Sequence, residues 1–209
     1  LQPDLVLGFS DMQAEIASQL VSAGVEIHIF NQRTIDEILN MLLTLGGRLG
    51  GTAISEQLVA ELQQGLAAVK VRAAALTTQP RVYFEEWDEP QLSGIRWVSE
   101  LIELAGGVEC FPELAREPMG KDRIIEDISE VPGRKPDIII GSWCGKKFRP
   151  EKVAARPGWS ETPAVRNGDL YEIKSPLILQ PGPAALTDGI AAIERIISSW
   201  AERHSSPTL

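Results

Sequence analysis

The chain has 209 residues, of which 44% are hydrophobic and 23% are charged, a composition typical of a globular protein with one large or two small domains. Its net charge of −9 repels phosphate backbones and so argues against nucleic-acid binding as its main role. The sequence has no apolar run of the roughly 18 residues that a membrane span requires, and its two cysteines are too few for a disulfide scaffold.

The first quarter of the chain alternates strand and helix patterns. The pattern predicts parallel strands at 5–8 and 25–30 and helices at 11–23 and 35–45. Ile16, Leu20 and Val21 are expected on the inner face of the first helix, which Ser10 or Asp11 caps. Two strands alone make a marginal lobe. We therefore expect that the chain begins inside a longer protein, so residues 1–8, which do not form a signal peptide, do not indicate a cytoplasmic location.

Residues 52–76 predict one long helix. Apolar residues recur there in steps of three or four, at Ile54, Leu58, Leu62, Leu66, Val69, Ala73 and Leu76. Only Gly65 interrupts the run, at a cost of about 1 kcal/mol. Such a helix spans roughly 35–40 Å at 1.5 Å per residue, about the width of a small domain. We interpret it as a rigid strut that joins two lobes.

The remainder of the chain again alternates strands and helices. The patterns predict strands at 81–86, 108–111, 138–141 and 168–173, and helices at 92–104, within 119–134, at 152–156 and at 187–200. The Pro-Asp-apolar-Gly pattern at 136–141 repeats that at 3–8. We therefore expect an α/β fold with two Rossmann-like lobes and parallel sheets, the N-terminal one truncated. The expected division is 1–51, the joining helix at 52–77, and 78–209.

A search for catalytic chemistry gives little. The sequence contains no nucleotide-binding glycine motif, no zinc motif and no nucleophile elbow. His28 is interpreted as structural and His204 as solvated. Cys144 has cationic neighbours but no nearby histidine in the sequence. We predict no catalytic residue, no metal site and no cofactor; Cys110 and Cys144 are expected to be free thiols, with a single bridge as the alternative.

Aromatic residues follow three predicted strands. Phe9, Trp87 and Trp143 each stand just past the end of one. Open α/β sheets bind ligands at the carboxyl ends of their strands. We therefore predict that the three rings share an apolar cleft, with core packing as the alternative for each. The other tryptophans are interpreted as core residues (Trp97 and Trp200) or are left open (Trp159).

An ordered set of segments resembles a known family. PDLVLG is followed by the long helix, then RVYFEEW, GGVECF and PDIIIGSW. This order resembles periplasmic solute-binding proteins of ABC importers, in the class that binds cobalamin (vitamin B12) and ferric siderophores, and most of all the cobalamin-binding branch. The resemblance covers essentially the whole chain. It implies a binding protein rather than an enzyme, located in the periplasm or outside the cell at the membrane, which delivers a small-molecule ligand to permease subunits.

The resemblance also implies roles for individual residues. In this family aromatic rings stack on the corrin ring, which assigns that role to Phe9, Trp87 and Trp143. The loop 179–183 matches a ligand-facing loop, which adds Gln180 and Pro181.

Surface glutamates of the family dock on arginines of the permease. The resemblance assigns Glu15 to this role in the first lobe, and Glu126 or Glu130 in the second; ordinary solvated carboxylates are the alternative. A ferric-siderophore or haem ligand also remains possible, because an anionic chelate requires cations. The candidate cations beside Trp143 are Lys146, Lys147 and Arg149.

Overall fold

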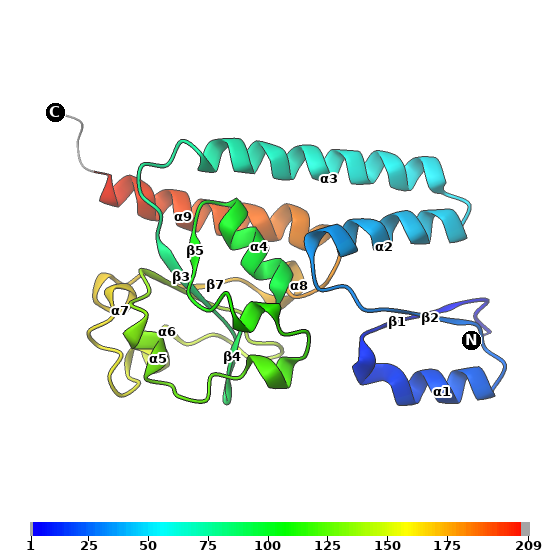
Figure 1. Cartoon of the computed structure of the whole chain (residues 1–209), viewed down its shortest axis with the longest axis horizontal. Coiled ribbons are helices and arrows are strands. Elements are labelled where there is room, and N and C mark those ends of the chain that lie inside the picture. The colour runs from blue at the N-terminus through cyan, green and yellow to red at the C-terminus, as the bar shows by residue number, and fades with distance from the viewer. Residues whose placement is uncertain (1, 206–209) are drawn as a thin grey trace.

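The computed structural model of the chain describes residues 2–205, apart from the side chain of Asp11. A small unit, here called the small lobe, lies at one end of the molecule (Figure 1). It comprises β1 (Val6–Phe9), the 3₁₀ turn η1 (Asp11–Gln13), α1 (Ala14–Ser22) and β2 (Ile27–Phe30). The two strands are parallel and pair from Val6↔Ile27 to Phe9↔Phe30.

A larger unit, here called the large lobe, follows residue 80. Within the described residues its sheet has five strands: β3 (Arg81–Asp88), β4 (Gln91–Ser93), β5 (Val108–Glu109), β6 (Ile138–Gly141) and β7 (Leu170–Glu172). β3 is parallel to β5 and β6 and antiparallel to β4, and β7 pairs with the far side of β6. The predicted α/β fold with parallel sheets is therefore confirmed.

The helices cover both lobes. The longer ones are α2 (Ile35–Arg48), α3 (Thr52–Ala73), α4 (Arg96–Leu104) and α9 (Ile190–His204). The shorter helices and turns are η2 (Leu114–Arg116), η3 (Gly120–Arg123), α5 (Glu130–Gly133), α6 (Pro150–Ala154), α7 (Pro163–Asn167), α8 (Ser175–Ile178) and the π-helical turn η4 (Ala185–Gly189). None of the helices in residues 2–205 is both long and apolar enough to cross a membrane.

The predicted long helix is α3, which begins at Thr52 as expected. It lies along α2 and α9 in Figure 1 and packs on α2, α4 and α9. Its buried face is formed by Ser55, Val59, Leu62, Leu66 and Val69. Ile54, which we expected to face inward, is 76% exposed. Because α3 is packed along most of its length, it is held rigidly over the large lobe, and this helical layer is here called the roof.

α2 also belongs to this roof. Ile38 and Leu39 of α2 are buried in the same apolar cluster as Trp97 of α4 and Ile193 of α9. The sequence analysis placed α2 within the division 1–51, whereas the structure packs it on α3 and α4. The proposed residue boundaries of the two lobes stay a prediction.

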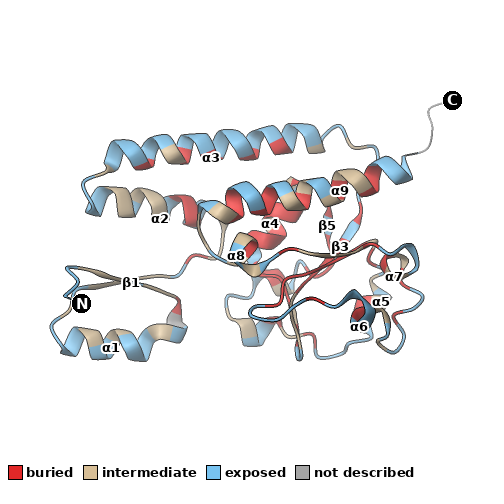
Figure 2. Ribbon diagram, turned by 180° about the vertical axis from the view of Figure 1, so that it is seen from behind, coloured by how far each residue is buried: buried red, intermediate tan, exposed pale blue. Residues whose placement is uncertain are grey.

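The large sheet is covered on both faces. Figure 2 shows the burial concentrated in α4, β3 and the neighbouring strands, with little in α1 and β1. Side chains of β3 and β6 alternate between two apolar clusters, as the period of a strand requires. Phe84 and Ile140 face the roof, while Tyr83 and Ile139 face the second cluster with Trp159. Trp97 and Trp200 are core residues, as predicted, and Trp159 is fully buried.

Three local predictions are wrong. Ile16 and Val21 are 55% and 62% exposed, because the narrow two-stranded sheet offers α1 too little surface to bury them. The helix expected at 92–104 begins only at Arg96, since Leu92 lies in β4. The last helix, expected at 187–200, begins at Ile190, because Thr187 lies in the π-helical turn, where its hydroxyl donates to the Pro183 carbonyl at 2.9 Å.

Candidate functional site: a pocket between the lobes

A pocket of about 360 Å³ lies where the small lobe meets the large lobe. Strands β1 and β2 form one wall, α2 forms a second, and the loop after α8 forms the third. Its described lining residues are Leu7, Gly8, Phe9, Gln13, Phe30, Gln32, Met41, Leu45, Gln180, Pro181 and Gly182. None of these side chains is charged. The polar ones are all glutamines, so the pocket combines apolar surface with neutral amides.

Two phenylalanines define the wall of the small lobe. Phe9 and Phe30 are the last residues of β1 and β2 and lie directly opposite each other, so both rings project from the same face of the sheet. Phe9 meets Trp97 of the large lobe edge-on, with ring centroids 6.5 Å apart. Its backbone N–H donates to Gln13 Oε1 at 2.7 Å. The Phe9 ring therefore connects the pocket to the main core.

Arg33 joins the two lobes beside the pocket. Its Nε donates to the Pro118 carbonyl of the large lobe at 2.7 Å, and its Nη1 donates to the Gln32 carbonyl at 3.0 Å. The guanidinium carbon lies 5.4 Å from the centroid of Phe9, a cation–π distance. These contacts fix the segment between β2 and α2.

The start of α2 is fixed as well. Thr34 and Glu37 form a capping box, and Glu37 Oε2 accepts the Arg33 backbone N–H at 2.6 Å. That bond is the main reason why the pKa of Glu37 lies below its usual value. Across the lobes, Glu100 of α4 accepts the Ile35 N–H at 2.8 Å. Segment 31–35 is thus held from both sides.

A neighbouring cavity of about 300 Å³ continues the pocket on the other side of Gln32. Phe30, Gln32 and Met41 line both cavities. Its other described lining residues are His28, Asn31, Glu37, Asn40 and Thr44. Gln32 is therefore the polar residue among the three that line both the pocket and the neighbouring cavity.

Three of the five predicted ligand-binding residues come together here. Phe9, Gln180 and Pro181 all line the interlobe pocket. Trp87 does not; it is a half-buried residue within β3, which extends to Asp88, and its Nε1 donates to the Glu89 carbonyl at 2.9 Å. The ligand-binding role of these residues stays a prediction.

Trp143 belongs to the core of the large lobe. It is only 4% exposed and packs edge-on against Phe148, with centroids 5.0 Å apart. Its Nε1 donates to Glu85 Oε1 at 3.0 Å. Core packing, the alternative given for this ring, is therefore what the structure has, because the carboxylate of Glu85, 58 residues away in the chain, holds the indole inside the large lobe.

Glu85 is the centre of a buried polar cluster at the carboxyl end of β3. Arg156 binds both of its oxygens, at 2.5 and 2.9 Å, and the Tyr83 hydroxyl donates to Oε2 at 3.1 Å. Burial, together with the charge of Glu85, raises the pKa of Tyr83 well above its usual value. Trp143 and Arg156 both belong to segment 142–159, so their bonds to Glu85 hold that segment onto the sheet.

The candidate cations lie apart from the interlobe pocket. Lys146 donates to Asp88 at 2.6 Å and lies 5.1 Å from the Trp87 ring centroid. Arg149 is 3.9 Å from Glu151. Lys147 is exposed. Two of the three cations proposed for an anionic ligand are thus already paired with carboxylates.

The cysteines are free, so the alternative of a single bridge is wrong. Cys110 is buried, and burial raises the pKa of its thiol to about 12, which keeps it unreactive. Cys144 is exposed on the loop after β6. No group of three or more metal-binding side chains lies within the part of the chain that the structure describes.

The predicted docking glutamates are all on the surface. Glu15 lies in the first turn of α1 and Glu126 in the segment before α5. Glu130 is bound to Arg134, one turn later, at 2.9 Å. Glu15 and Glu126 have no ion pair among the described residues, which leaves them more available to a partner than Glu130.

Phe30 and Gln32 are pocket residues that the sequence reasoning missed. The signal for Phe30 was present, because it ends β2 just as Phe9 ends β1. Gln32 carried no signal, since its burial depends on α2 folding back over the strand. The carboxyl end of a parallel strand was therefore the informative position for both phenylalanines.

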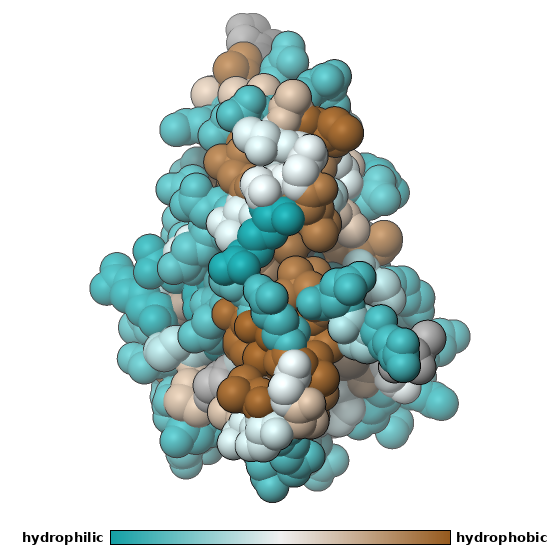
Figure 3. All heavy atoms as spheres, turned by 90° about the vertical axis from the view of Figure 1, so that its right-hand side faces the viewer, coloured by the Kyte–Doolittle hydropathy of each residue, from teal (hydrophilic) through white to brown (hydrophobic). Residues whose placement is uncertain are grey.

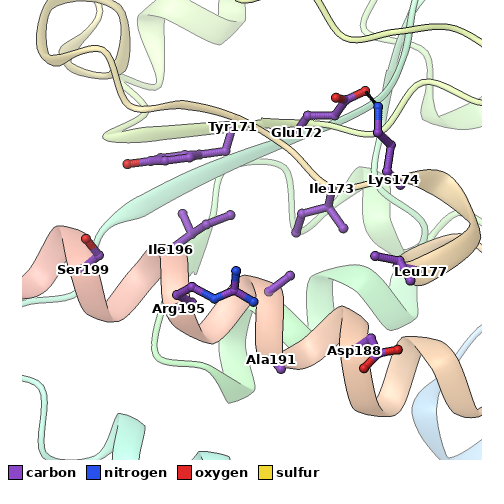
Figure 4. A pocket seen from close by; sticks show the side chains of 11 residues that line it. Tyr171, Glu172, Ile173, Lys174, Leu177, Asp188, Ala191, Arg195, Ile196 and Ser199 are labelled. Atoms are coloured by element: carbon purple, nitrogen blue, oxygen red, sulfur yellow. Dashed lines mark ion pairs between the residues drawn. The ribbon is translucent and has the colours of Figure 1, made fainter.

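A larger cavity of about 670 Å³ lies elsewhere, between the edge strand β7 and α9 (Figure 4). Ile173, Leu177 and Ile196 contribute apolar surface, and charged residues of both signs surround it, including Asp188 and Arg195. Glu172 and Lys174 pair across its rim at 2.7 Å. It contains none of the predicted site residues and touches only the large lobe.

Comparison with known proteins gives three findings. A family model described as "Periplasmic binding protein" matches residues 1–177. A vitamin B12-binding protein of Vibrio parahaemolyticus is 25% identical over 95% of this chain and 70% of its own length. An uncharacterized ABC transporter substrate-binding lipoprotein of Bacillus subtilis is 22% identical over 94% of this chain, which spans only 62% of that relative.

A solved structure supports the fold. The periplasmic heme-binding protein RhuT from Roseiflexus sp. RS-1 superposes with a TM-score of 0.73 at 23% identity, over 93% of this chain and 77% of that structure. Relatives of different ligand chemistry therefore share this fold.

Proposed function

Because this chain belongs to the periplasmic binding protein family, we propose that it is the substrate-binding component of an ABC importer and that its ligand is cobalamin or a related corrinoid. The relatives named above are binding proteins rather than enzymes. The similarity to a vitamin B12-binding protein over 95% of the chain supports this ligand class.

The uncharged lining of the interlobe pocket is the observation that carries the proposal. A macrocycle needs a wide apolar contact and a few polar anchors. Phe9, Phe30 and Met41 supply the apolar contact, and the glutamines supply neutral hydrogen-bonding groups. A volume of about 360 Å³ is at the low end for ligand pockets, so the pocket would hold one edge of a corrin rather than the whole ring.

A ferric siderophore or haem is the second candidate, favoured by the haem-binding protein of similar fold. Such ligands carry anionic groups, which need arginine or lysine partners when they are removed from water. Lys146 is instead paired with Asp88, and Arg149 is close to Glu151. The corrinoid proposal therefore agrees better with the distribution of charge.

We extend the proposal to the partner and the location. Glu15 on the small lobe and Glu126 on the large lobe would contact cationic side chains of the permease. The protein would act outside the cytoplasm, in the periplasm or at the outer surface of the membrane, as the family description and the lipoprotein relative suggest.

A titration tests the ligand. Cyanocobalamin is added to the purified chain, and binding is followed by isothermal titration calorimetry and by quenching of tryptophan fluorescence. Trp97 is a suitable reporter because it contacts Phe9. We expect a dissociation constant in the micromolar range or below, and a loss of at least tenfold for Phe9→Ala and Phe30→Ala. Met12→Ala, a substitution of an 87% exposed residue of the same lobe, serves as the control.

Two results would count against the proposal. The absence of heat and quenching at micromolar cyanocobalamin would remove the corrinoid ligand. Binding of haemin or a ferric siderophore, weakened by Lys147→Ala and not by Phe30→Ala, would replace it with the second candidate.

A further inference from the structure

Gln32 carries a polar atom that the folded chain leaves unsatisfied. Its side chain is only 6% exposed, and its Oε1 is buried without a hydrogen-bond partner among the described residues. The same side chain lines both cavities of the interlobe site. Buried polar groups are nearly always paired, so an unpaired amide oxygen at a cavity wall requires an explanation.

The backbone on the C-terminal side of Gln32 is fixed. Arg33 Nη1 holds the Gln32 carbonyl at 3.0 Å, and Arg33 Nε is anchored on the large lobe at Pro118. Two residues later, the capping box fixes Thr34 and Glu37. The backbone of Gln32 is therefore fixed, and a rotation of its side chain alone can bring the buried amide oxygen to the wall of either cavity.

The other glutamines of the pocket do not share this property. Gln13 Oε1 already accepts the Phe9 N–H at 2.7 Å. Gln180 is exposed and can be satisfied by water. The remaining buried unpaired side-chain atoms in the described part of the chain belong to residues that line neither cavity of the site. Within the described lining of the two cavities, Gln32 Oε1 is thus the single buried side-chain acceptor without a hydrogen-bond donor.

We infer that Gln32 determines the specificity of the site by accepting a hydrogen bond from a neutral carboxamide N–H of the ligand, and that it disfavours a carboxylate at the same point. This inference rests on the proposed function, because it concerns the ligand of that site. A corrin carries carboxamide groups on its rim, whereas haem carries carboxylates.

The physical basis is an asymmetry between the two groups. A carboxamide brings a donor for Oε1 and an acceptor for the other end of the glutamine amide, so both partners are satisfied. A carboxylate brings only acceptors, which repel Oε1. If the glutamine amide rotates to donate, the carboxylate is still a charge removed from water, and no cation belongs to the described lining of the pocket. The cation beside it, Arg33, is already bound to the Pro118 and Gln32 carbonyls. A site built to pair with a hydrogen-bonding group rejects the wrong group strongly.

The first experiment uses minimal probes that do not depend on the corrinoid proposal. The ¹⁵N-labelled chain is titrated with acetamide and, separately, with acetate, and the side-chain amide signals of Gln32 are followed by NMR. Their assignment comes from their loss in Gln32→Leu. We expect a saturable shift with acetamide and none with acetate. An equal shift with both probes, or no shift with acetamide, would overturn the inference.

The second experiment uses cyanocobalamin. Gln32→Leu is expected to weaken binding at least tenfold, and the matched control Gln180→Leu by less than threefold. Thermal unfolding separates a binding role from a structural one. Because leucine removes an unsatisfied buried acceptor, Gln32→Leu should melt at the same temperature as the wild type or higher. A lower melting temperature together with weaker binding would assign Gln32 a structural role and reject the inference.

The two experiments distinguish the two proposals. If the wild type does not bind cyanocobalamin but acetamide still shifts the Gln32 signals, the corrinoid fails and the preference for an amide stands. If cyanocobalamin binds and Gln32→Leu binds it equally well, the proposed function stands and the role of Gln32 fails.

Discussion

The small lobe and the large lobe use the same kind of strand but bury it to different extents. All four residues of β6 are buried, whereas the four residues of β2 are half-buried. α1 has no buried residue, while α4, of the same length, has five. Exposed large apolar residues gather at the end of the molecule that bears the small lobe, where Figure 3 shows apolar surface between polar margins.

The difference indicates where the stability of the fold resides. Apolar burial is the main favourable term in folding, so most of the free energy of unfolding comes from the large sheet and the helices α2, α3, α4 and α9. The small lobe has little core of its own and depends on its contacts with that body. The interlobe pocket therefore has one firmly packed wall and one wall of lower local stability, as is common at binding sites.

Matched isoleucines test this comparison with the largest expected effect. Ile139 in β6 is fully buried and Ile29 in β2 is half-buried, and both lie in parallel strands. Ile139→Ala should lower the free energy of unfolding by about 2–5 kcal/mol, because it removes transfer energy and leaves a cavity. Ile29→Ala should lower it by about 1 kcal/mol, since water already reaches the side chain.

Urea denaturation followed by circular dichroism measures both values. Equal losses for the two variants would mean that the small lobe is as well packed as the large sheet, and the comparison would fail. Ile16→Ala, at a site that is 55% exposed, provides the reference for a surface change in the same lobe.

A buried carboxyl group of the large lobe gives the next largest effect. Glu109 in β5 is 6% exposed, and its Oε1 accepts the Phe111 N–H at 3.1 Å while Oε2 has no partner among the described residues. Burial raises the pKa of Glu109 from 4.5 to about 7. Because only a well-packed region desolvates a carboxyl group so strongly, the raised pKa of Glu109 is a measure of how tightly the large lobe is packed.

The sign of the pH dependence follows from the raised pKa. Below pH 4.5 the carboxyl is protonated in both states and lowers stability little. Between pH 4.5 and about 7 the unfolded chain releases the proton while the folded chain keeps it, so stability falls as the pH rises. Above pH 7 the loss reaches about 3 kcal/mol.

Glu109→Gln should therefore be more stable than the wild type by up to about 3 kcal/mol at pH 8, and nearly equal to it at pH 4.5. Glutamine can keep the bond from the Phe111 N–H. Unfolding in urea at the two pH values measures the difference. A gap between the variant and the wild type that does not change with pH would show that Glu109 titrates normally.

The smallest expected effect concerns the junction of the lobes. Thr34 caps α2 through the Glu37 N–H at 3.1 Å, within the box that holds the segment carrying Gln32. Thr34→Ala should lower the free energy of unfolding by about 1 kcal/mol. Thr34→Ser keeps the cap and should lie within about 0.5 kcal/mol of the wild type. A loss for Thr34→Ser as large as that for Thr34→Ala would show that the methyl group, and not the cap, stabilises the junction.

Much of the fold could be predicted because it depends on local patterns. The regular spacing of apolar residues gave α3, and Gly24 ends α1 in the left-handed region with φ of +79°. Strand β4 was missed because Leu92 and Ser93 were assigned to the helix that follows, whereas they pair with β3 across a hairpin turn at Glu89 and Pro90. The inner face of α1 was misassigned because periodicity shows which residues share a face, not how much surface is available to cover it.

The site was predicted in part for a related reason. Phe9 was found from its place at the end of a strand, and Gln180 and Pro181 from the resemblance. The burial of Trp143 depends on Glu85, and the burial of Gln32 depends on α2 and Arg33. Such long-range pairings leave no periodic trace in the sequence.

The contacts between the lobes have a thermodynamic consequence for ligand capture. Arg33 is bound to the Pro118 carbonyl and Phe9 packs on Trp97, so a large rotation of the small lobe would have to break both contacts. The arrangement that receives the ligand is then the arrangement that is populated before the ligand arrives. When nearly all molecules are already in this binding-competent arrangement, no binding free energy is lost in selecting it. The apparent dissociation constant then equals the intrinsic one.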